Sequence, residues 1–392
     1  GIHVKKYFKN LDSCVIEVPV DLLSELAAIN EVHFVTGDDD VMSLGHVSST
    51  TGADDVRSQL TTASSLDGTG IGIAVLDSGI YSEHKAFNGR VVYSRDFTGE
   101  NRIDDPFGHG THVASAAAGN GALYNGSYTG IAPNANLINL RVLNAEGRGS
   151  TATVLSALDW VFSNRAAYNI RVVNMSLGGA AISSFKNDPL CIAVRRLVDS
   201  GIVVVVAAGN DGKDEFGRKQ YGAIHSPGNE PSAITVGANS FSTNGRNDDL
   251  ITSYSSRGPT RSYWSDDNGV RHYDNLIKPD LVAPGNKLVF AASPNNLLTT
   301  INPSLETGLA PGKNNQKMMY LSGTSVSSPI CSARRGGAAA GGGSPARIGR
   351  APAGPLRPVR RIHGRAQRPQ GALRGADPGR PRRGDRRQPH PE

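Results

Sequence analysis

Four polar residues, far apart in the chain, have side chains that could together cleave an acyl bond: Asp77, His109, Asn210 and Ser325. A serine hydroxyl supplies a nucleophile, an imidazole can take up its proton, and a carboxylate can orient that imidazole. A side-chain amide can donate a hydrogen bond to the oxyanion that forms on the attacked carbonyl. The order Asp, His, Ser along the chain is one of three in which such a triad occurs.

Two of these residues follow apolar runs. Asp77 comes directly after Ile71–Leu76, and Asn210 ends the run that begins at Val203. Each side chain is therefore expected at the carboxyl end of a strand. Taken alone, Asp77 also fits a turn or a helix cap, and Asn210 fits a turn residue that tolerates left-handed geometry.

The other two residues lie in glycine-containing turns. His109 stands between two glycines in Gly108-His-Gly-Thr-His-Val-Ala-Ser, which predicts the start of a helix. His109 and His112 also suggest metal ligation, but the HExxH pattern is absent and no third ligand cluster stands out. Ser325 in Gly323-Thr-Ser-Val-Ser-Ser-Pro is expected where a turn enters a helix, with its own N–H facing an anion. A plain serine helix cap is the alternative, and the hydrolase motif GxSxG is not matched.

Apolar β-branched runs alternate with amphipathic segments between Gly70 and about Ser328. Strands are predicted at Ile71–Leu76, Leu137–Val142, Val172–Met175, Ile202–Ala208 and Ala233–Val236, and helices at Thr111–Ala118, Thr151–Asn164 and Leu190–Ser200. This alternation predicts an α/β fold with a parallel sheet covered by helices on both faces. Reactive groups of such folds lie beyond the carboxyl ends of the strands.

Three of these motifs resemble the active-site signatures of the subtilisin-like serine peptidases (subtilases): Val75-Leu-Asp77-Ser-Gly, Gly108-His109-Gly-Thr-His-Val-Ala and Gly323-Thr-Ser325-Val-Ser-Ser-Pro. Ala207-Ala-Gly-Asn210 is similar to the oxyanion segment of that family. The resemblance keeps its order from about Gly70 to Pro329. It implies a three-layer, subtilisin-like α/β fold and a serine endopeptidase that cleaves proteins through an acyl-enzyme.

The resemblance also implies roles for individual residues. Ser325 would be the nucleophile, His109 its general base, Asp77 the residue that orients the imidazole, and Asn210 an oxyanion donor. The substrate backbone would add as a strand to segments that include Gly149, Ser150, Ser176, Leu177, Gly178, Ala208 and Gly209. A catalytically dead scaffold that only binds peptides is the alternative function.

Cofactors, partners and location are expected from the same resemblance. No cofactor is needed for the chemistry, and structural calcium is common in the family, but no calcium ligands can be assigned to this chain. The expected partners are protein or peptide substrates and the chain's own prosegment, and the expected state is a monomer. Secretion is implied, with the signal region absent from this chain.

Residues 1–44 differ in pattern from the rest of the chain. They hold a strand-like run from Cys14 to Val20, an apolar helical pattern starting at Leu22, and a second strand-like piece at Val32–Val35. We expect part of a small α+β unit, similar to the end of the family's inhibitory prosegment. Residues 45–69, rich in Ser and Thr, indicate a linker, and 70–330 the peptidase domain.

Charge is distributed unevenly. Residues 1–331 hold 26 Lys and Arg against 32 Asp and Glu, whereas residues 332–392 hold 15 Arg, no Lys and 3 acidic residues. The net charge of +6 therefore divides into −6 for the body and +12 for the tail. The body gives no reason to expect a nucleic-acid partner, and its longest apolar run, Ile202–Ala208, is too short to cross a membrane. Three cysteines cannot form a disulfide framework.

The tail, residues 331–392, has an unusual composition. Arg, Gly, Ala and Pro make up 46 of the 61 residues from 332 to 392, which leaves too few large apolar side chains to order a segment. We interpret it as a reading-frame slip in GC-rich DNA from about Cys331 onward. An Arg-rich nucleic-acid arm and a genuine disordered extension are the alternatives. Because a buried helix after Ser325 would then be lost, the chain as written is expected to fold poorly or to be inactive.

Overall fold

The computed structural model describes residues 2–9, 13–33, 35, 47–58, 66–241, 248–310 and 312–339, with side chains in the last helix as far as Ala333. Eight strands form the main sheet: β3 (Gly72–Asp77), β4 (Val91–Asp96), β5 (Asn136–Arg141), β6 (Ile170–Met175), β7 (Val203–Ala207), β8 (Ile234–Ser240), β9 (Leu250–Ile251) and β12 (Leu281–Pro284). Seven lie in the order β12-β8-β7-β6-β3-β5-β4 and are parallel, and β9 pairs antiparallel with β8. The predicted parallel α/β fold is confirmed.

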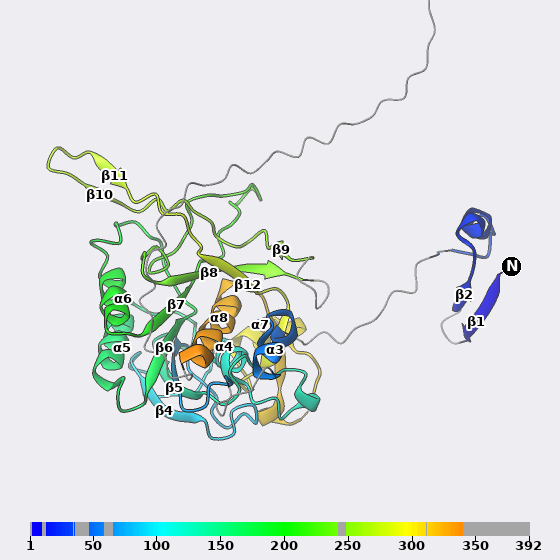
Figure 1. Ribbon diagram of the computed structural model, residues 1–392. Coiled ribbons are helices and arrows are strands. Elements are labelled where there is room, and N and C mark those ends of the chain that lie inside the picture. Colours follow the sequence, from blue (N-terminus) through cyan, green and yellow to red (C-terminus); the bar gives the residue numbers. More distant parts are fainter. Residues whose placement is uncertain are drawn as a thin grey trace, which may run out of the picture. The chain divides into compact units, whose positions relative to one another are not determined.

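The interior strand β3 shows why the sheet is covered on both faces. Ile73 and Val75 belong to one buried cluster, while Ala74 and Leu76 belong to another. Successive side chains of a strand point to opposite faces, so an uninterrupted apolar run requires a layer on each side. Figure 1 shows these layers, with α5 and α6 on one side and α4 and α8 on the other.

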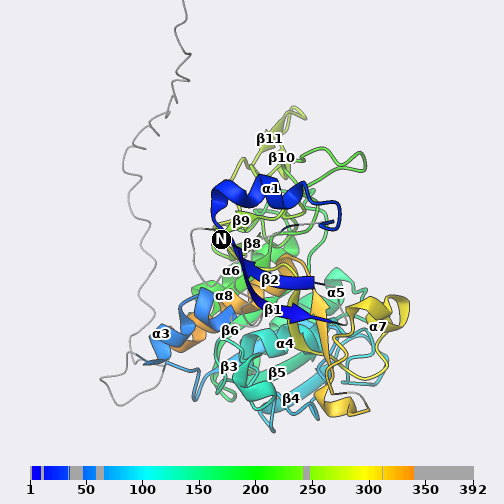
Figure 2. The same cartoon turned by 90° about the vertical axis from the view of Figure 1, so that its right-hand side faces the viewer.

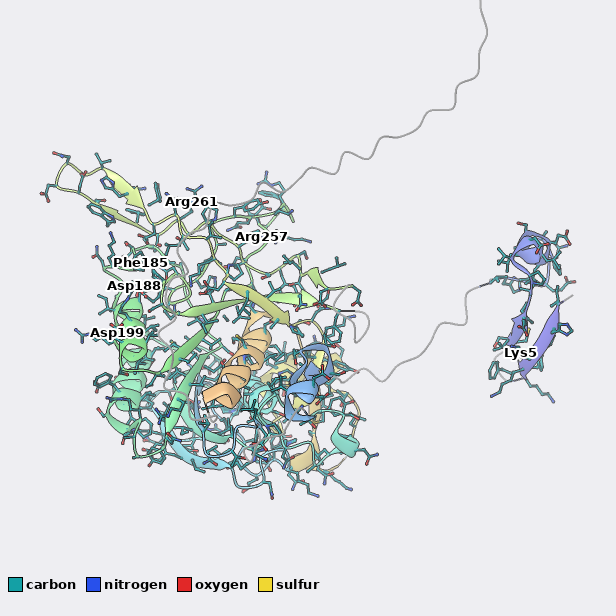
Figure 3. The ribbon with its side chains drawn as sticks, in the orientation of Figure 1. Lys5, Phe185, Asp188, Asp199, Arg257 and Arg261 are labelled. Carbon is teal, nitrogen blue, oxygen red and sulfur yellow. The ribbon has the colours of Figure 1, made fainter. Side chains whose placement is uncertain are left out.

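Helices α5 (Thr151–Asn164) and α6 (Pro189–Asp199) begin with strong capping residues. The Ser150 hydroxyl accepts from the Thr153 N–H at 3.1 Å, and the Thr153 hydroxyl accepts from the Ser150 N–H at 3.0 Å. This reciprocal pair satisfies two otherwise free donors. The Asp188 carboxylate caps α6 by accepting from Leu190 N at 2.9 Å; Asp188 and Asp199 mark the two ends of α6 in Figure 3.

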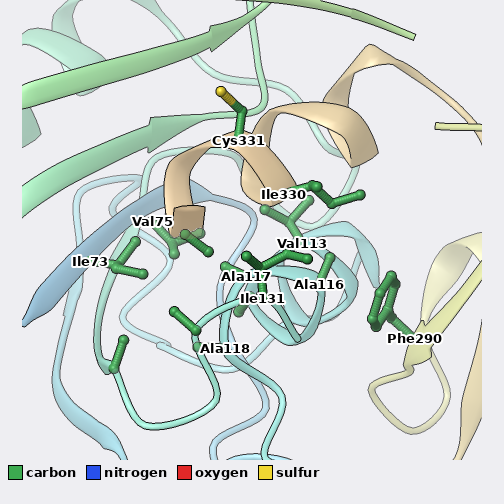
Figure 4. Packing of buried hydrophobic residues seen from close by; sticks show 14 of the residues in the cluster. Ile73, Val75, Val113, Ala116, Ala117, Ala118, Ile131, Phe290, Ile330 and Cys331 are labelled. Carbon is green, nitrogen blue, oxygen red and sulfur yellow. The ribbon is translucent and has the colours of Figure 1, made fainter. Parts of the chain in front are cut away.

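Helices α4 (His109–Ala118) and α8 (Thr324–Ala339) pack together on the other face. Figure 4 shows Ile330 of α8 beside Val113 and Ala117 of α4, with Ile73 and Val75 of β3 nearby, while the Cys331 side chain points to the opposite side of α8. Cys331 and Ala333 belong to this buried cluster, and Ser332 is fully buried. Ordered structure therefore crosses the predicted boundary at residue 330. The predicted frame slip from about Cys331 onward stays a prediction, and residues 340–392 lie outside the described residues.

The remaining elements of the main body are short: α2 (Val47–Thr50), α3 (Ala53–Ser58), η2 (Tyr124–Gly126), β10 (Tyr263–Ser265), β11 (Arg271–Tyr273), β13 (Leu288–Ala291), α7 (Leu297–Ile301), η3 (Pro303–Leu305), η4 (Asn314–Gln316) and β14 (Met318–Leu321). Strand β13 pairs with β14, and β10 pairs with β11. The β10–β11 hairpin projects away from the sheet in both views (Figures 1 and 2). No helix in the described part of the chain is long and apolar enough to span a membrane.

The N-terminal segment contains β1 (His3–Phe8), β2 (Ser13–Glu17), η1 (Val20–Leu22) and α1 (Leu23–Ala27). Strand β2 and the helix fall where the sequence predicts them. The predicted second strand at Val32–Val35 is wrong, because the described residues in that piece are not in a strand. The partner of β2 is β1 instead, in an antiparallel hairpin in which His3 faces Glu17.

Two buried histidines are expected to make the fold sensitive to acid. Burial lowers the pKa of His84 to about 4 and that of His112 to about 3, from 6.5. Burial outweighs the hydrogen bond from Nε2–H of His84 to Lys317 O at 2.9 Å, which favours the charged ring, and the neutral Nδ1 accepts from Ala86 N at 3.1 Å. Below pH 6.5 the unfolded chain binds protons that the folded chain excludes, so stability falls as the pH falls.

Urea unfolding at several pH values between 7.5 and 4 measures this effect. Each histidine is expected to lower the free energy of unfolding by up to about 1.4 kcal/mol for every unit that the pH falls between the pKa in the unfolded chain and the pKa in the folded chain. His84→Gln should lower stability at pH 7.5 but show a shallower loss below pH 6.5. If the free energy of unfolding of that variant falls with pH as steeply as that of the parent, the acid sensitivity cannot be assigned to His84.

Candidate active site

The buried carboxylate of Asp77 lies at the end of β3, an interior strand of the sheet. Its Oδ1 accepts from the N–H of Ser78 at 2.8 Å and lies 2.8 Å from Nδ1 of His109. Its Oδ2 has no hydrogen-bond partner in the described chain. Both contacts therefore converge on a single carboxylate oxygen.

His109 is the first residue of α4, directly after Gly108, whose φ of +103° few residues other than glycine adopt. Because the Asp77 oxygen can only accept, Nδ1 of His109 carries the proton and Nε2 is left to accept one. Burial lowers the pKa of His109, but the charge of Asp77, its hydrogen bond and the charge of Asp105 outweigh burial and raise the pKa above its usual value. The imidazole is thus positioned to take up and hold a proton.

Ser325 is half-buried in the first turn of α8, and Asn210 is exposed after the end of β7. The Asn210 Oδ1 accepts from the Thr324 N–H at 2.9 Å, which turns its Nδ2 donor the other way. A Cβ added to Gly323 would lie 2.9 Å from Ser325 Oγ and 3.3 Å from Asn210 Nδ2. The serine hydroxyl and the amide donor therefore border the same small space.

A polar network holds the first turn of α8 against β6. The Ser176 hydroxyl donates to the Ser325 carbonyl at 2.6 Å and contacts the Ser328 hydroxyl at 2.8 Å. Asn174 donates to Ser176 at 2.9 Å, and Ser332 donates to Asn174 at 2.8 Å. The network includes Ser332, which lies beyond the predicted domain boundary. These bonds fix the backbone of the predicted nucleophile.

The four predicted catalytic residues surround one cleft of about 960 Å³, three of them as lining residues: His109, Asn210 and Ser325. Asp77 lies behind His109. Of the predicted substrate-binding residues, those that line the cleft are Gly149, Ser150, Ser176, Leu177, Gly178 and Gly209. Ala208 is fully buried and is not among the lining residues. The 148–150 and 176–178 segments belong to no strand of the described sheets, so an extended ligand could pair with them.

Two residues of the cleft were not singled out from the sequence. His225 donates through Nε2 to the Asp211 carboxylate at 2.6 Å. Its ring occupies the space beside Gly178 and Gly209, where a Cβ on either glycine would lie 2.8 Å from a His225 carbon. Asp211 could have been found from the sequence, because it directly follows Asn210. Nothing in the sequence around His225 indicates that folding brings it to the cleft.

The described residues offer little for metal binding. His112 is fully buried and donates through Nε2 to Leu288 O at 3.1 Å, so it does not face the cleft with His109. Among the described residues, no group of three or more His, Cys, Asp or Glu side chains could hold a metal ion. No calcium ligands are therefore assigned.

Comparison with known proteins identifies the family of this chain. The model of the subtilase family matches residues 68–337. The chain belongs to the subtilase family. This subtilase is 34% identical over 342 residues to the serine protease AprX of Bacillus subtilis (strain 168), covering 84% of this chain and 70% of AprX. It is 35% identical over 263 residues to the extracellular serine proteinase of Thermus sp. (strain Rt41A), covering 63% of this chain and 58% of that proteinase.

Solved structures show the same fold. Sphericase is 28% identical, with a TM-score of 0.53, and the match covers 74% of this chain and 82% of sphericase. A protease described as S41 psychrophilic protease is 29% identical, with a TM-score of 0.51, and the match covers 74% and 82% of the two chains. The predicted subtilisin-like architecture is therefore confirmed, and the relatives are serine proteases.

Proposed function

We propose that this subtilase is a serine endopeptidase that hydrolyses peptide bonds in proteins through an acyl-enzyme on Ser325. The observation that carries the proposal is the 2.8 Å contact from His109 Nδ1 to Asp77, on a ring that lines the same cleft as Ser325 and Asn210. The orientation leaves Nε2 of His109 as the proton acceptor for the Ser325 hydroxyl.

In the proposed reaction, Ser325 Oγ attacks the carbonyl carbon of the scissile bond while His109 Nε2 takes the hydroxyl proton. The carbonyl oxygen becomes an oxyanion that accepts hydrogen bonds from Asn210 Nδ2 and the Ser325 N–H. His109 then gives its proton to the departing amine, which leaves an ester on Ser325. Water, deprotonated by His109, attacks the ester, and the acid product leaves as Ser325 recovers its proton. Asp77 stabilises the imidazolium during both acylation and deacylation.

Backbone pairing supports a broad range of protein substrates. An extended peptide that lies between Gly149–Ser150 and Ser176–Gly178 would add a strand, because neither segment has a strand partner in the described sheets. Main-chain hydrogen bonds do not depend on sequence. Side-chain preference would then come from the cleft walls, including His225.

Location and partners complete the proposal. The name of the Thermus relative supports secretion. We also propose that residues 1–44 are part of an inhibitory prosegment, and that the peptidase works as a monomer. The net charge of −6 over residues 1–331 does not favour nucleic acid as a partner.

Digestion of unfolded casein by the purified chain tests the activity. Mass spectrometry of the products is expected to show cleavage inside the casein chains, and pretreatment with a fluorophosphonate should abolish it. Release of single terminal residues only would contradict an endopeptidase, and products that resist the fluorophosphonate would contradict a serine nucleophile.

Asn210→Ala is expected to lower kcat about 10²- to 10³-fold, because the oxyanion loses one of its two donors. KM should change much less, since the ground-state carbonyl depends less on that donor. Asn210→Asp is the matched variant: it preserves the oxygen that accepts from Thr324 N but replaces the donor with an anion. Rates of peptide hydrolysis over a range of substrate concentrations give kcat and KM of both variants, and an Asp variant as active as the parent would contradict the role of Asn210.

A further inference from the structure

A second buried carboxylate, Asp105, lies behind the Asp77–His109 pair. Its Oδ1 accepts from the Ser78 hydroxyl at 2.8 Å and from the Gly108 N–H at 2.8 Å, and its Oδ2 accepts from the Thr111 N–H at 2.7 Å. Gly108 and Thr111 flank His109 at the start of α4. The carboxylate thus binds the backbone on both sides of the proposed general base.

Ser78 connects this carboxylate to Asp77. Its N–H donates to Asp77 Oδ1, while its hydroxyl donates to Asp105 and accepts from the Gly110 N–H at 3.0 Å. The hydroxyl has one proton, and it lies nearer Asp105 (2.8 Å) than Asp77 (3.3 Å). One side chain therefore ties the end of β3 to the start of α4, with Asp105 as the acceptor that fixes it.

Burial of the Asp105 carboxylate is unfavourable for folding stability, so stability by itself does not explain its position. It is buried and, in the described chain, forms no ion pair with Lys or Arg. Burying a carboxylate without a cation requires compensation by hydrogen bonds. Here the compensation comes from the N-terminal N–H groups of α4, whose dipole favours an anion. A cation does form next to it in the proposed reaction, when His109 takes up the serine proton.

We propose that Asp105 is a positioning residue that holds His109 against Asp77 and adds a second negative charge to stabilise the imidazolium. This inference rests on the proposed function. The charge of Asp105 contributes to the raised pKa of His109, after burial and the Asp77 interactions. The other titratable or charged groups are His112, which lies on the same helix, and Arg148, Asp188, Asp211 and His225, which line the same cleft as His109. None of them binds the first turn of α4 as Asp105 does.

The test measures the second-order rate of fluorophosphonate labelling of the full chain between pH 4 and 9. Asp105→Asn removes the charge, and its amide nitrogen cannot accept from Thr111 N. In the profile of labelling rate against pH, we expect the plateau at high pH to fall about tenfold or more. We also expect the acid limb, where the rate falls as His109 is protonated, to move to lower pH because the imidazolium is less stabilised. Asp104→Asn, which removes the neighbouring half-buried carboxylate paired with Arg102, is the matched control and should keep both values.

A second variant separates positioning from charge. Ser78→Ala keeps both carboxylates but removes the connecting hydroxyl, so the plateau rate should fall while the acid limb stays in place. Thermal unfolding shows whether each variant folds. If Asp105→Asn does not fold, Ser78→Ala decides the positioning role. Plateau rate and acid limb unchanged in Asp105→Asn, or a parental plateau rate in folded Ser78→Ala, would overturn the inference. Failure of the parent chain to label would instead overturn the proposed function.

Discussion

Replacing Ser325 by alanine is expected to lower casein hydrolysis by about 10⁶-fold, the size seen when the nucleophile of such a triad is removed. Without the hydroxyl no acyl-enzyme forms, and Asn210 has no oxyanion to stabilise. The fold should be unaffected, because the Ser325 side chain makes no hydrogen bond in the described chain and the network to β6 uses its carbonyl. Rates of casein cleavage and thermal unfolding of parent and variant measure both claims.

Ser322→Ala provides the matched control. Ser322 is an exposed serine three residues earlier, and its hydroxyl accepts from Lys287 N at 2.8 Å without lining the cleft. This variant should retain activity within about twofold. Activity retained by folded Ser325→Ala would refute Ser325 as nucleophile.

Asp77→Ala is expected to lower kcat about 10⁴-fold. The substitution removes the acceptor that holds Nδ1–H of His109 and the largest favourable charge on its imidazolium. The acid limb of activity should move to lower pH, since the pKa of His109 loses the influence that raises it. Peptide hydrolysis between pH 4 and 9 measures the rate and the limb together.

Asp77→Asn separates geometry from charge. Ser78 N and His109 Nδ1 both contact Oδ1, and Oδ2 is free of partners in the described chain. An amide oxygen in the Oδ1 position could therefore accept from both, preserving the ring orientation but not the charge. We expect a smaller loss than in Asp77→Ala. An Ala variant within tenfold of the parent would contradict the role of Asp77, and an Asn variant as impaired as Ala would show that the charge dominates.

Much of the central fold could be predicted from short-range patterns. Helix α5 occupies the predicted range Thr151–Asn164, because Ser150 and Thr153 form a local capping pair and Val154, Leu158 and Val161 repeat at helical spacing. The β-branched runs of β6 and β7 fit a strand buried on both faces. These signals lie within the elements themselves, so distant parts of the chain do not alter them.

The site residues could be selected because each lies within two residues of a glycine or at a strand end, where backbone geometry is constrained. The structure brings three of them to one cleft and places Asp77 behind His109. Asp105 and His225 could not be selected in this way. Their surroundings come from other segments: Ser78 meets Asp105 across 27 positions, and Asp211 meets His225 across 14.

The prediction of a second N-terminal strand failed for a physical reason. The β-branched residues Val32 and Val35 suggested a strand, but pairing with a neighbour decides whether a strand forms, and β2 pairs with His3–Phe8. For the tail, composition averaged over residues 332–392 concealed its first residues. Cys331, Ser332 and Ala333 are small enough to pack in α8 against the core, and they do so.

The most direct test of the assembled triad is to label the purified 392-residue chain with a fluorophosphonate and locate the adduct by mass spectrometry. We predict one adduct, on Ser325, whose formation is lost in Ser325→Ala and strongly slowed in Asp77→Ala. The labelled chain would also show that residues beyond Ala333 do not prevent the site from forming. Absence of labelling in the folded chain, or an adduct on another serine, would contradict the assignment of Ser325, His109 and Asp77 as a working triad.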